Sequence, residues 1–546
     1  MLSRLLILIV VLSASALAQD ARFPSRDYFR QQWTKPPLQV ETPPLLRLED
    51  FAAGGRLELS LRSYIELVMA NNTDVAIQKL TLLTAQNAIQ RAFAPFDPTF
   101  QASFNNSRSS TPSNDLLAGA AVLGNLSQRA NFSYTQTMES GTQYTVGFFG
   151  NKTANNSQFT NFNPSIQTNL QFNVTQPLLR NRGMFINRVP ILMARSRLRV
   201  TGTDLRQRVT DLLTQAENGY WDVIDARETL RVREKALELS EAFLKRSTRE
   251  LELGAISPLD IFQPQQQHAA AQVAVTQASY RLKQREDALR RWIGADLHPE
   301  FRKLPLELTE TVMPPSEGQA VEPEDAVTRA LRLRPEMEGS RFNTDVIDLQ
   351  IQQATNALRP DLSLGANYTS QGRGGNFFQR AFPGTGGTST TTLIPGGFGD
   401  SLDQLFHFRF PIYGFTLNLR LPLRDRRAAS DLSDAVVSKR RDALAQRGLE
   451  QRIRLEVLNA ISGVEQSRAG VKQAAVARDF AQKRLAAEQQ KYELGVVQAF
   501  FVLQAQQDLT TAESEVLSQS IAFRRNRLAM LQATGELLDE RGVVLR

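Results

Sequence analysis

The chain has 546 residues, no cysteine and a formal net charge of +8. Without cysteine, disulfides and a diacylated N-terminal cysteine anchor are both excluded, so the fold must be stabilised by buried area and packing, which a long chain can provide. The basic residues are dispersed among 56 acidic ones. Because no clustered basic face with interleaved aromatics results, nucleic-acid binding is not indicated.

The first eighteen residues have the pattern of a secretory signal peptide. Arg4 supplies the charged start, Leu5–Leu12 form an apolar core, and Ala16-Leu17-Ala18 is a small-residue cleavage site. The apolar run is too short to span a membrane as a helix, and a buried N-terminal helix is the alternative interpretation. The sequence therefore predicts an exported protein, with residues 19–58 forming a Pro-rich periplasmic arm.

A first helical region is predicted from Ser60 to Phe93, where Pro95 and Pro98 end it. From about residue 99 to 176 charged residues become scarce and apolar residues alternate with polar ones in four segments, near 99–106, 126–137, 142–151 and 166–176. Residues 362–368 and 415–421 alternate likewise around a Gly-rich loop. Such strands with long polar loops favour the wall of a transmembrane β-barrel, with a soluble β-sandwich as the alternative.

Two very long helices follow the β-rich regions, at about 188–253 and 425–494. The first keeps heptad spacing, with one four-residue step that is a coiled-coil stutter. These apolar positions are Leu198, Leu205, Leu212, Ala216, Val223, Leu230, Leu237, Leu244 and Leu251. At 1.5 Å per residue each helix spans ~100 Å. A return helix follows each, at about 258–297 and 498–533, so two α-hairpins are predicted.

The second half of the chain repeats the plan of the first. Glu252-Leu253-Gly254 and Glu493-Leu494-Gly495 end the two long helices, 241 positions apart, and Gly294 falls on Gly535 at the same offset. A glycine at each helix end predicts a left-handed cap and a hairpin tip. We therefore expect two repeats, at 59–316 and 317–546. The first repeat contains a strand region at ~99–176 and a helical hairpin at ~188–297. The second contains a strand region at ~361–423 and a helical hairpin at ~425–533.

At this point the sequence resembles the TolC-like outer-membrane efflux proteins. The resemblance rests on the duplicated plan, the Pro-ended strand entries, the paired tips and the segment Gln176-Pro177-Leu178-Leu179. Arg334-Pro335-Glu336 is also similar to the family's Asn-Pro-Glu turn. The resemblance implies an α+β membrane protein in the outer membrane of a Gram-negative cell. The resemblance also implies a homotrimer in which each chain contributes four strands to one shared β-barrel, with the helices forming an α-helical barrel in the periplasm.

Open sheet edges in lipid leave backbone groups unsatisfied, which independently requires strands from several chains. One departure concerns the first β-rich region, which holds four alternating segments where the family plan needs two. We expect one hairpin to extend beyond the membrane, rather than a larger barrel.

The resemblance places function at the hairpin tips. Asp260 matches an acidic position of the family's tip helices, and a ring of three carboxylates would act on cations. The equivalent second-repeat position is Phe501, preceded by Phe500, which indicates a partly apolar constriction. Two structural alternatives remain open: Asp260 as a helix cap or ion-pair partner, and the two phenylalanines as hairpin core. Gly254, Asp260, Gly495, Phe500 and Phe501 are the candidate tip and gate residues.

No catalytic, cofactor or metal site is indicated. His268, His298 and His407 have no partners at metal-site spacing, and Gly384–Thr388 lacks the Lys-Ser/Thr of a phosphate loop. The predicted function is a passive exit duct for efflux or type I secretion, working with a periplasmic adaptor, an inner-membrane pump and outer-membrane lipid. A periplasmic adaptor with a coiled-coil hairpin is the alternative, and a hydrolytic envelope enzyme is a third class.

Overall fold

The computed structural model describes residues 48–53, 55–112, 120–157, 160–254, 256–297, 299–312, 322–381 and 390–543. The chain divides into two units, residues 1–50 and 51–546, and the following concerns the second. The predicted signal peptide, most of the predicted arm, His298 and Gly384–Thr388 lie outside the described residues.

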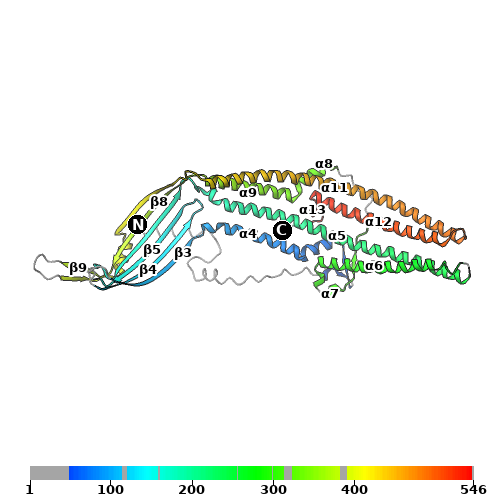
Figure 1. Cartoon of the computed structure of the whole chain (residues 1–546), viewed down its shortest axis with the longest axis horizontal. Helices are drawn as coiled ribbons and strands as arrows, with labels where there is room; N and C mark the ends of the chain where they lie inside the picture. The colour runs from blue at the N-terminus through cyan, green and yellow to red at the C-terminus, as the bar shows by residue number, and fades with distance from the viewer. Residues whose placement is uncertain are drawn as a thin grey trace. The chain divides into compact units, whose positions relative to one another are not determined.

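Helical and strand regions alternate along the second unit (Figure 1). They are β1 (Ala52–Ala53), β2 (Arg56–Leu59), α3 (Leu61–Asn71), α4 (Thr73–Phe93), η2 (Ala94–Phe96), β3 (Thr99–Pro112), β4 (Val122–Thr137), β5 (Gln143–Asn155), β6 (Ser165–Pro177), α5 (Met184–Glu252), α6 (Phe262–Trp292), η4 (Ala295–Leu297), α7 (Pro299–Arg302), β7 (Leu306–Leu308), α8 (Pro323–Leu333), α9 (Pro335–Ala357), β8 (Asp361–Gly374), β9 (Phe377–Ala381), β10 (Thr390–Ile394), α10 (Phe398–Phe406), β11 (Phe410–Arg420), α11 (Arg426–Glu493), α12 (Ala499–Thr534) and α13 (Leu537–Glu540).

The first predicted helix is two helices. Asn72 ends α3 and begins α4, because its side-chain oxygen accepts hydrogen bonds from the backbone N–H groups of Asp74 and Val75. An asparagine in extended conformation is among the best helix N-caps. The sequence Asn72-Thr73-Asp74 carried that signal.

The two long helices are present, with 69 residues in α5 and 68 in α11. Helix α6 packs back along α5, and α12 packs back along α11 (Figure 1). The shorter helix α4 lies against α5, while α9 contacts both α5 and α11. Of the helices that the structure describes, none is both long and apolar enough to cross a membrane.

Apolar residues from α8, α9, α11 and α12 form a core at the middle of the second repeat. Ile453 and Val457 of α11 are fully buried there, against Ala326 and Ala330 of α8. Alanines on α8 let the two helices approach closely, while the β-branched side chains of α11 fill the space between them. This core holds the short helices against the long hairpin.

A single six-stranded antiparallel sheet contains strands from both repeats, in the order β11-β8-β6-β5-β4-β3. Segments β9 and β10 form a separate pair, and β2 runs parallel to β7 in a small sheet with β1. The alternating sequences Arg56–Leu59 and Leu306–Leu308 gave a strand signal for β2 and β7 that the sequence interpretation did not use.

The expectation of one extended hairpin in the first repeat is wrong. All four alternating segments lie side by side, and one line of paired positions crosses the whole sheet. Its members are Phe100, Tyr134, Val146, Phe172, Tyr368 and Tyr413. If one hairpin only extended the sheet at its end, β3 and β6 would pair directly with each other over part of their length. Instead, β4 and β5 lie between β3 and β6 along the whole length of these strands.

Candidate functional site

Both hairpin tips are built on a left-handed glycine, as predicted. Gly254 follows α5 with φ of 70°, and Gly495 follows α11 with φ of 73°. Backbone N–H groups at these ends return to the last helical turn, from Gly254 to the Leu251 carbonyl and from Gly495 to the Tyr492 carbonyl, each at 2.9 Å. A residue with a Cβ would be strained at this φ. Both tips therefore use glycine to adopt the same left-handed backbone conformation.

Asp260 is exposed and closes the turn that precedes α6. Its backbone N–H donates to the Ser257 carbonyl at 2.9 Å, and its Oδ2 accepts from the Ser257 N–H at 3.3 Å. The carboxylate thus has a local capping contact and remains open to solvent on its other side. Phe501, its repeat partner, lies inside α12, since α12 begins four residues earlier than the 241-residue offset predicts from α6.

Phe500 and Phe501 are half exposed, at 49% and 46%, with ring centroids 5.6 Å apart in an edge-on arrangement. The core of the hairpin end consists of the residues that follow them. These are Val502, Leu503, Ala505 and Leu509, packed against Phe243 and Leu485. The phenylalanine pair is therefore available to a neighbour or to the solvent, whereas Val502 and Leu503 fill the interior.

A cluster near the tips joins the first hairpin to the second. Arg246 of α5 donates from Nε to Glu250 at 2.9 Å and from Nη1 to Glu493 of α11 at 3.1 Å. The Tyr492 hydroxyl of α11 donates to Glu250 Oε2 at 2.6 Å. The Arg246 guanidinium also lies over the Tyr492 ring, 5.2 Å from its centroid. We call these four residues the tip clamp.

The pKa values of Tyr492 and Arg246 favour the protonation states that make the hydrogen bonds of the tip clamp. Burial, reinforced by the hydrogen bond to Glu250, raises the pKa of Tyr492 to about 12. The hydrogen bond to Glu250 is the main cause that raises the pKa of Arg246. At neutral pH the hydroxyl therefore carries its proton and donates it, while the guanidinium stays charged. Sequence patterns did not identify this clamp, because it depends on residues of two repeats meeting.

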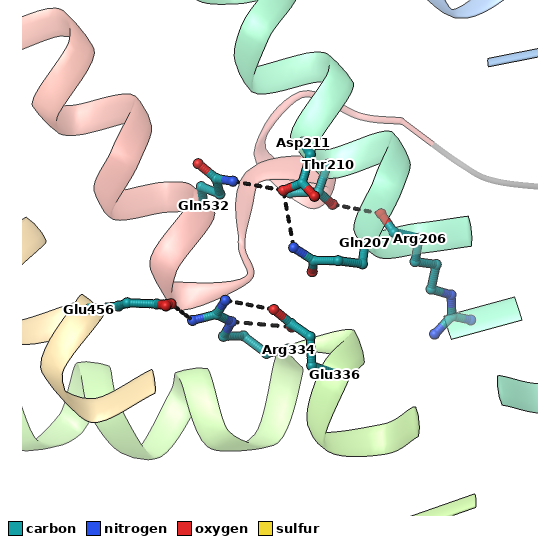
Figure 2. A network of polar contacts seen from close by, with 8 residues as sticks. All are labelled: Arg206, Gln207, Thr210, Asp211, Arg334, Glu336, Glu456 and Gln532. Carbon is teal, nitrogen blue, oxygen red and sulfur yellow. Dashed lines mark hydrogen bonds and ion pairs between the residues drawn. The ribbon is translucent and has the colours of Figure 1, made fainter. Parts of the chain in front are cut away.

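A second polar network ties the two repeats together where α8 meets α9. Arg334 lies between these helices and pairs with Glu336, at 2.6 Å from Nη2 to Oε1, and with Glu456 of α11 (Figure 2). Figure 2 also shows Asp211 of α5, which accepts from Gln532 of α12 at 2.9 Å and from Gln207 at 3.1 Å. The Arg334-Pro335-Glu336 segment is thus an interhelix joint.

Burial raises the pKa of Asp211 despite the two amide donors, and the neighbouring Glu336 carboxylate adds to the effect. The guanidinium of Arg334 stays protonated, because its bonds to Glu336 and Glu456 raise its pKa although burial opposes this. These groups are paired with protein partners, so the network has a structural role. No group of three or more metal-binding side chains occurs in the part of the chain that the structure describes.

The six-stranded sheet has one apolar and one polar face. Side chains alternate between faces along a strand, and paired positions share a face. The apolar face carries Phe100, Ala102, Phe132, Tyr134, Tyr144, Val146, Phe148, Leu170, Phe172, Val174, Leu364, Ala366, Tyr368, Tyr413, Phe415, Leu417 and Leu419. The opposite face is mostly amide and hydroxyl side chains, including the line Thr99, Thr135, Thr145, Asn173 and Asn367.

Two contacts fasten the β4–β5 turn to the start of α5. Arg188 of α5 donates from Nε to Glu139 Oε2 at 2.6 Å, and its Nη2 donates to the same oxygen. The Gly183 N–H donates to the Ser140 carbonyl at 3.2 Å. The hairpin of β4 and β5 is therefore fixed to the start of α5, at the end of the sheet where β6 continues into the helices.

Comparison with known proteins gives one consistent answer. The outer membrane efflux protein family matches residues 326–536, and no curated protein matches the chain. The chain is similar to the Campylobacter jejuni CmeC outer membrane channel, with a TM-score of 0.61 and 14% identity over 96% of this chain and 91% of that one.

Two further solved structures show the same fold. The outer membrane protein VceC from Vibrio cholerae aligns with a TM-score of 0.60 and 15% identity over 87% of this chain and 96% of its own. CusC, described by its transmembrane channel formation, aligns with a TM-score of 0.61 and 15% identity over 88% and 93%. The predicted α+β fold is confirmed by these structures, and residues 326–536 of this chain match the outer membrane efflux protein family.

Proposed function

We propose that this chain is a passive exit duct in the outer membrane of a Gram-negative cell, working as a homotrimer. The observation that carries the proposal is a single sheet with one apolar face, connected to helical hairpins whose long helices span ~100 Å. An apolar face suits contact with lipid, and a polar face suits a water-filled lumen. The helices would then extend into the periplasm.

The duct would receive its cargo from an inner-membrane pump through a periplasmic adaptor, in drug or metal efflux or in type I secretion. Grooves beside the tips, around Leu253–Asp260 and Leu494–Phe501, are where adaptor hairpins would dock. Leu253 and Leu494 are both largely exposed there, which supports a docking role because exposed apolar groups at helix ends favour a partner. Energy would come from the pump, since the duct itself performs no chemistry.

A periplasmic adaptor is the weaker alternative. It would also contain an α-hairpin, but it has no need for a sheet with an apolar face of aromatic and aliphatic side chains. Membrane fractionation separates the two functions. A duct is expected in the outer membrane as an SDS-resistant oligomer that dissociates on heating, whereas a detergent-independent soluble monomer would contradict the proposal. Deletion of the gene should sensitise cells to an exported compound or abolish a secreted product.

We place the gate at the tips, with Phe500 and Phe501 narrowing the passage and Asp260 adding charge. Half-exposed aromatic rings on three chains could close a pore by bulk and dewetting. Asp260, held by Ser257, would present its free side to passing cations.

The substitution Phe501→Ala is expected to raise single-channel conductance in a planar bilayer, because it removes apolar bulk from the constriction. Phe480→Ala is the matched control, since Phe480 is an exposed ring on α11 away from the tip loop. Unchanged conductance in Phe501→Ala would remove Phe501 from the gate, while leaving the duct itself in place.

A further inference from the structure

The six-stranded sheet ends in two long strands that each have only one neighbour in the part of the chain that the structure describes. Strand β3, with 14 residues, pairs only with β4, and β11, with 11 residues, pairs only with β8. Every residue of both strands is exposed. Long flat edges of this kind bind another strand, because their outer N–H and C=O groups lack partners.

These two edges are complementary in direction. The six strands alternate up and down, so β3 and β11 run in opposite directions. If β11 of one copy lay beside β3 of another, the antiparallel pattern would continue across the junction without a break. An odd number of strands would have forced a parallel pair there.

The side chains of the two edges also match. Phe100 on β3 and Phe415 on β11 are 64% and 80% exposed and lie on the same apolar face of the sheet. Gln101 on β3 and Thr416 on β11 lie on the polar face. A junction that keeps the faces aligned would extend the aromatic surface on one side and the polar surface on the other.

We propose that β3 of each copy pairs with β11 of the next, with β4 and β5 as full members of the wall. Three sheets of six strands then close one wall of eighteen strands. This inference rests on the proposed trimeric duct and departs from the four strands per chain that the resemblance implies. The partner is a second copy of this chain.

Closure within one copy would not give a duct. About eight strands already form a barrel whose interior side chains fill it, whereas 16–18 strands leave an aqueous channel. In a barrel of six strands, the polar side chains that line the interior would fill it and leave no space for water. Pairing between copies satisfies both edges and keeps the polar face hydrated.

The cysteine-free sequence allows a direct test by disulfide cross-linking in outer-membrane vesicles. Gln101→Cys on β3 is combined in turn with Gly414→Cys, Thr416→Cys or Asn418→Cys on the polar face of β11. We expect one or two adjacent positions to shift the unreduced SDS band from one chain to three. Gln101→Cys with Tyr413→Cys, Phe415→Cys or Leu417→Cys is the matched control, because these side chains point to the other face.

A second pair of variants tests whether β4 and β5 belong to the wall. Ser103→Cys with Asn131→Cys joins paired positions of β3 and β4 and is expected to cross-link within one chain. Ser103→Cys with Asn169→Cys would cross-link only if β3 lay directly beside β6, as in a wall of four strands per chain. A β3–β6 disulfide with no β3–β4 disulfide would overturn the eighteen-strand wall.

The two levels of failure are distinguishable. A heat-dissociable oligomer in the outer membrane that forms no β3–β11 cross-link at any polar-face position overturns the edge pairing and leaves the duct intact. A chain that fractionates as a soluble monomer overturns the proposed function and the edge pairing together.

Discussion

The substitution Arg541→Ala is expected to destabilise the helical part more than any other single change proposed here. Glu217 of α5 is 1% exposed, and its carboxylate accepts two bonds from Arg541, at 3.0 Å from Nε and 2.7 Å from Nη2. Removing one partner of a buried ion pair costs about 3–5 kcal/mol, although the Trp221 indole N–H, at 3.4 Å from Glu217 Oε1, would still donate to the carboxylate. Thermal or urea denaturation of the purified protein in detergent, followed by circular dichroism, would measure the loss.

Two comparisons make that result specific. Arg527→Ala removes a half-exposed pair with Glu540, at 3.6 Å, and should cost less than about 1 kcal/mol. In the Arg541→Ala background, Glu217→Gln should recover part of the lost stability, because it removes the buried charge. Equal stability of Arg541→Ala and Arg527→Ala would show that Glu217 is satisfied without its arginine.

The second large effect is expected at the tip clamp. Arg246→Glu replaces the cation that holds Glu250 and Glu493 with a third carboxylate, so α5 and α11 should separate near the tips. Each pair is partly exposed and contributes at most about 1 kcal/mol. In a trimer the three clamps would open together, so their contributions would add. Changing the ratio of open to closed tips from 1:99 to 99:1 takes about 5.5 kcal/mol. A combined shift of several kcal/mol would therefore open tips that are mostly closed.

The measurement is single-channel conductance, together with the uptake of a large hydrophilic antibiotic by whole cells. Both should rise in Arg246→Glu. Arg478→Glu serves as the control, because Arg478 pairs with Asp479 on its own helix, and among the described residues it has no ion pair with another hairpin. A conductance equal to that of the unsubstituted protein would mean that the clamp does not hold the tips together.

Local signals in the sequence predicted much of this fold. Leu-Gly at 253–254 and 494–495 located both tips, because glycine readily adopts the backbone conformation that ends these helices. The duplication is visible in the backbone as well, since Gly294 and Gly535 also have positive φ, 73° and 79°. Helix length followed from the absence of proline over most of α5 and α11.

Features that depend on distant segments were not predicted. Alternation identified the strands of the six-stranded sheet, but it does not say which strand is the neighbour of which, so the order β6-β5-β4-β3 could not be derived. Heptad spacing selected Leu198, Leu205 and Leu212, which are only half buried in the single chain, whereas Val209 and Leu213 are fully buried. The tip clamp and the Glu217–Arg541 pair join residues hundreds of positions apart, for which a single sequence offers no pattern.

The anchored turn between β4 and β5 has a consequence for how the two ends of such a protein can evolve. A hairpin returns the polypeptide to the side from which it departed, so inserting one leaves the direction of β6 and its passage into α5 unchanged. In the proposed duct, the circumference of the barrel could therefore grow by two strands per subunit at a time, while the number of helices in each subunit stays constant. The width of the proposed barrel and the width of its helical end would then be able to change independently in evolution.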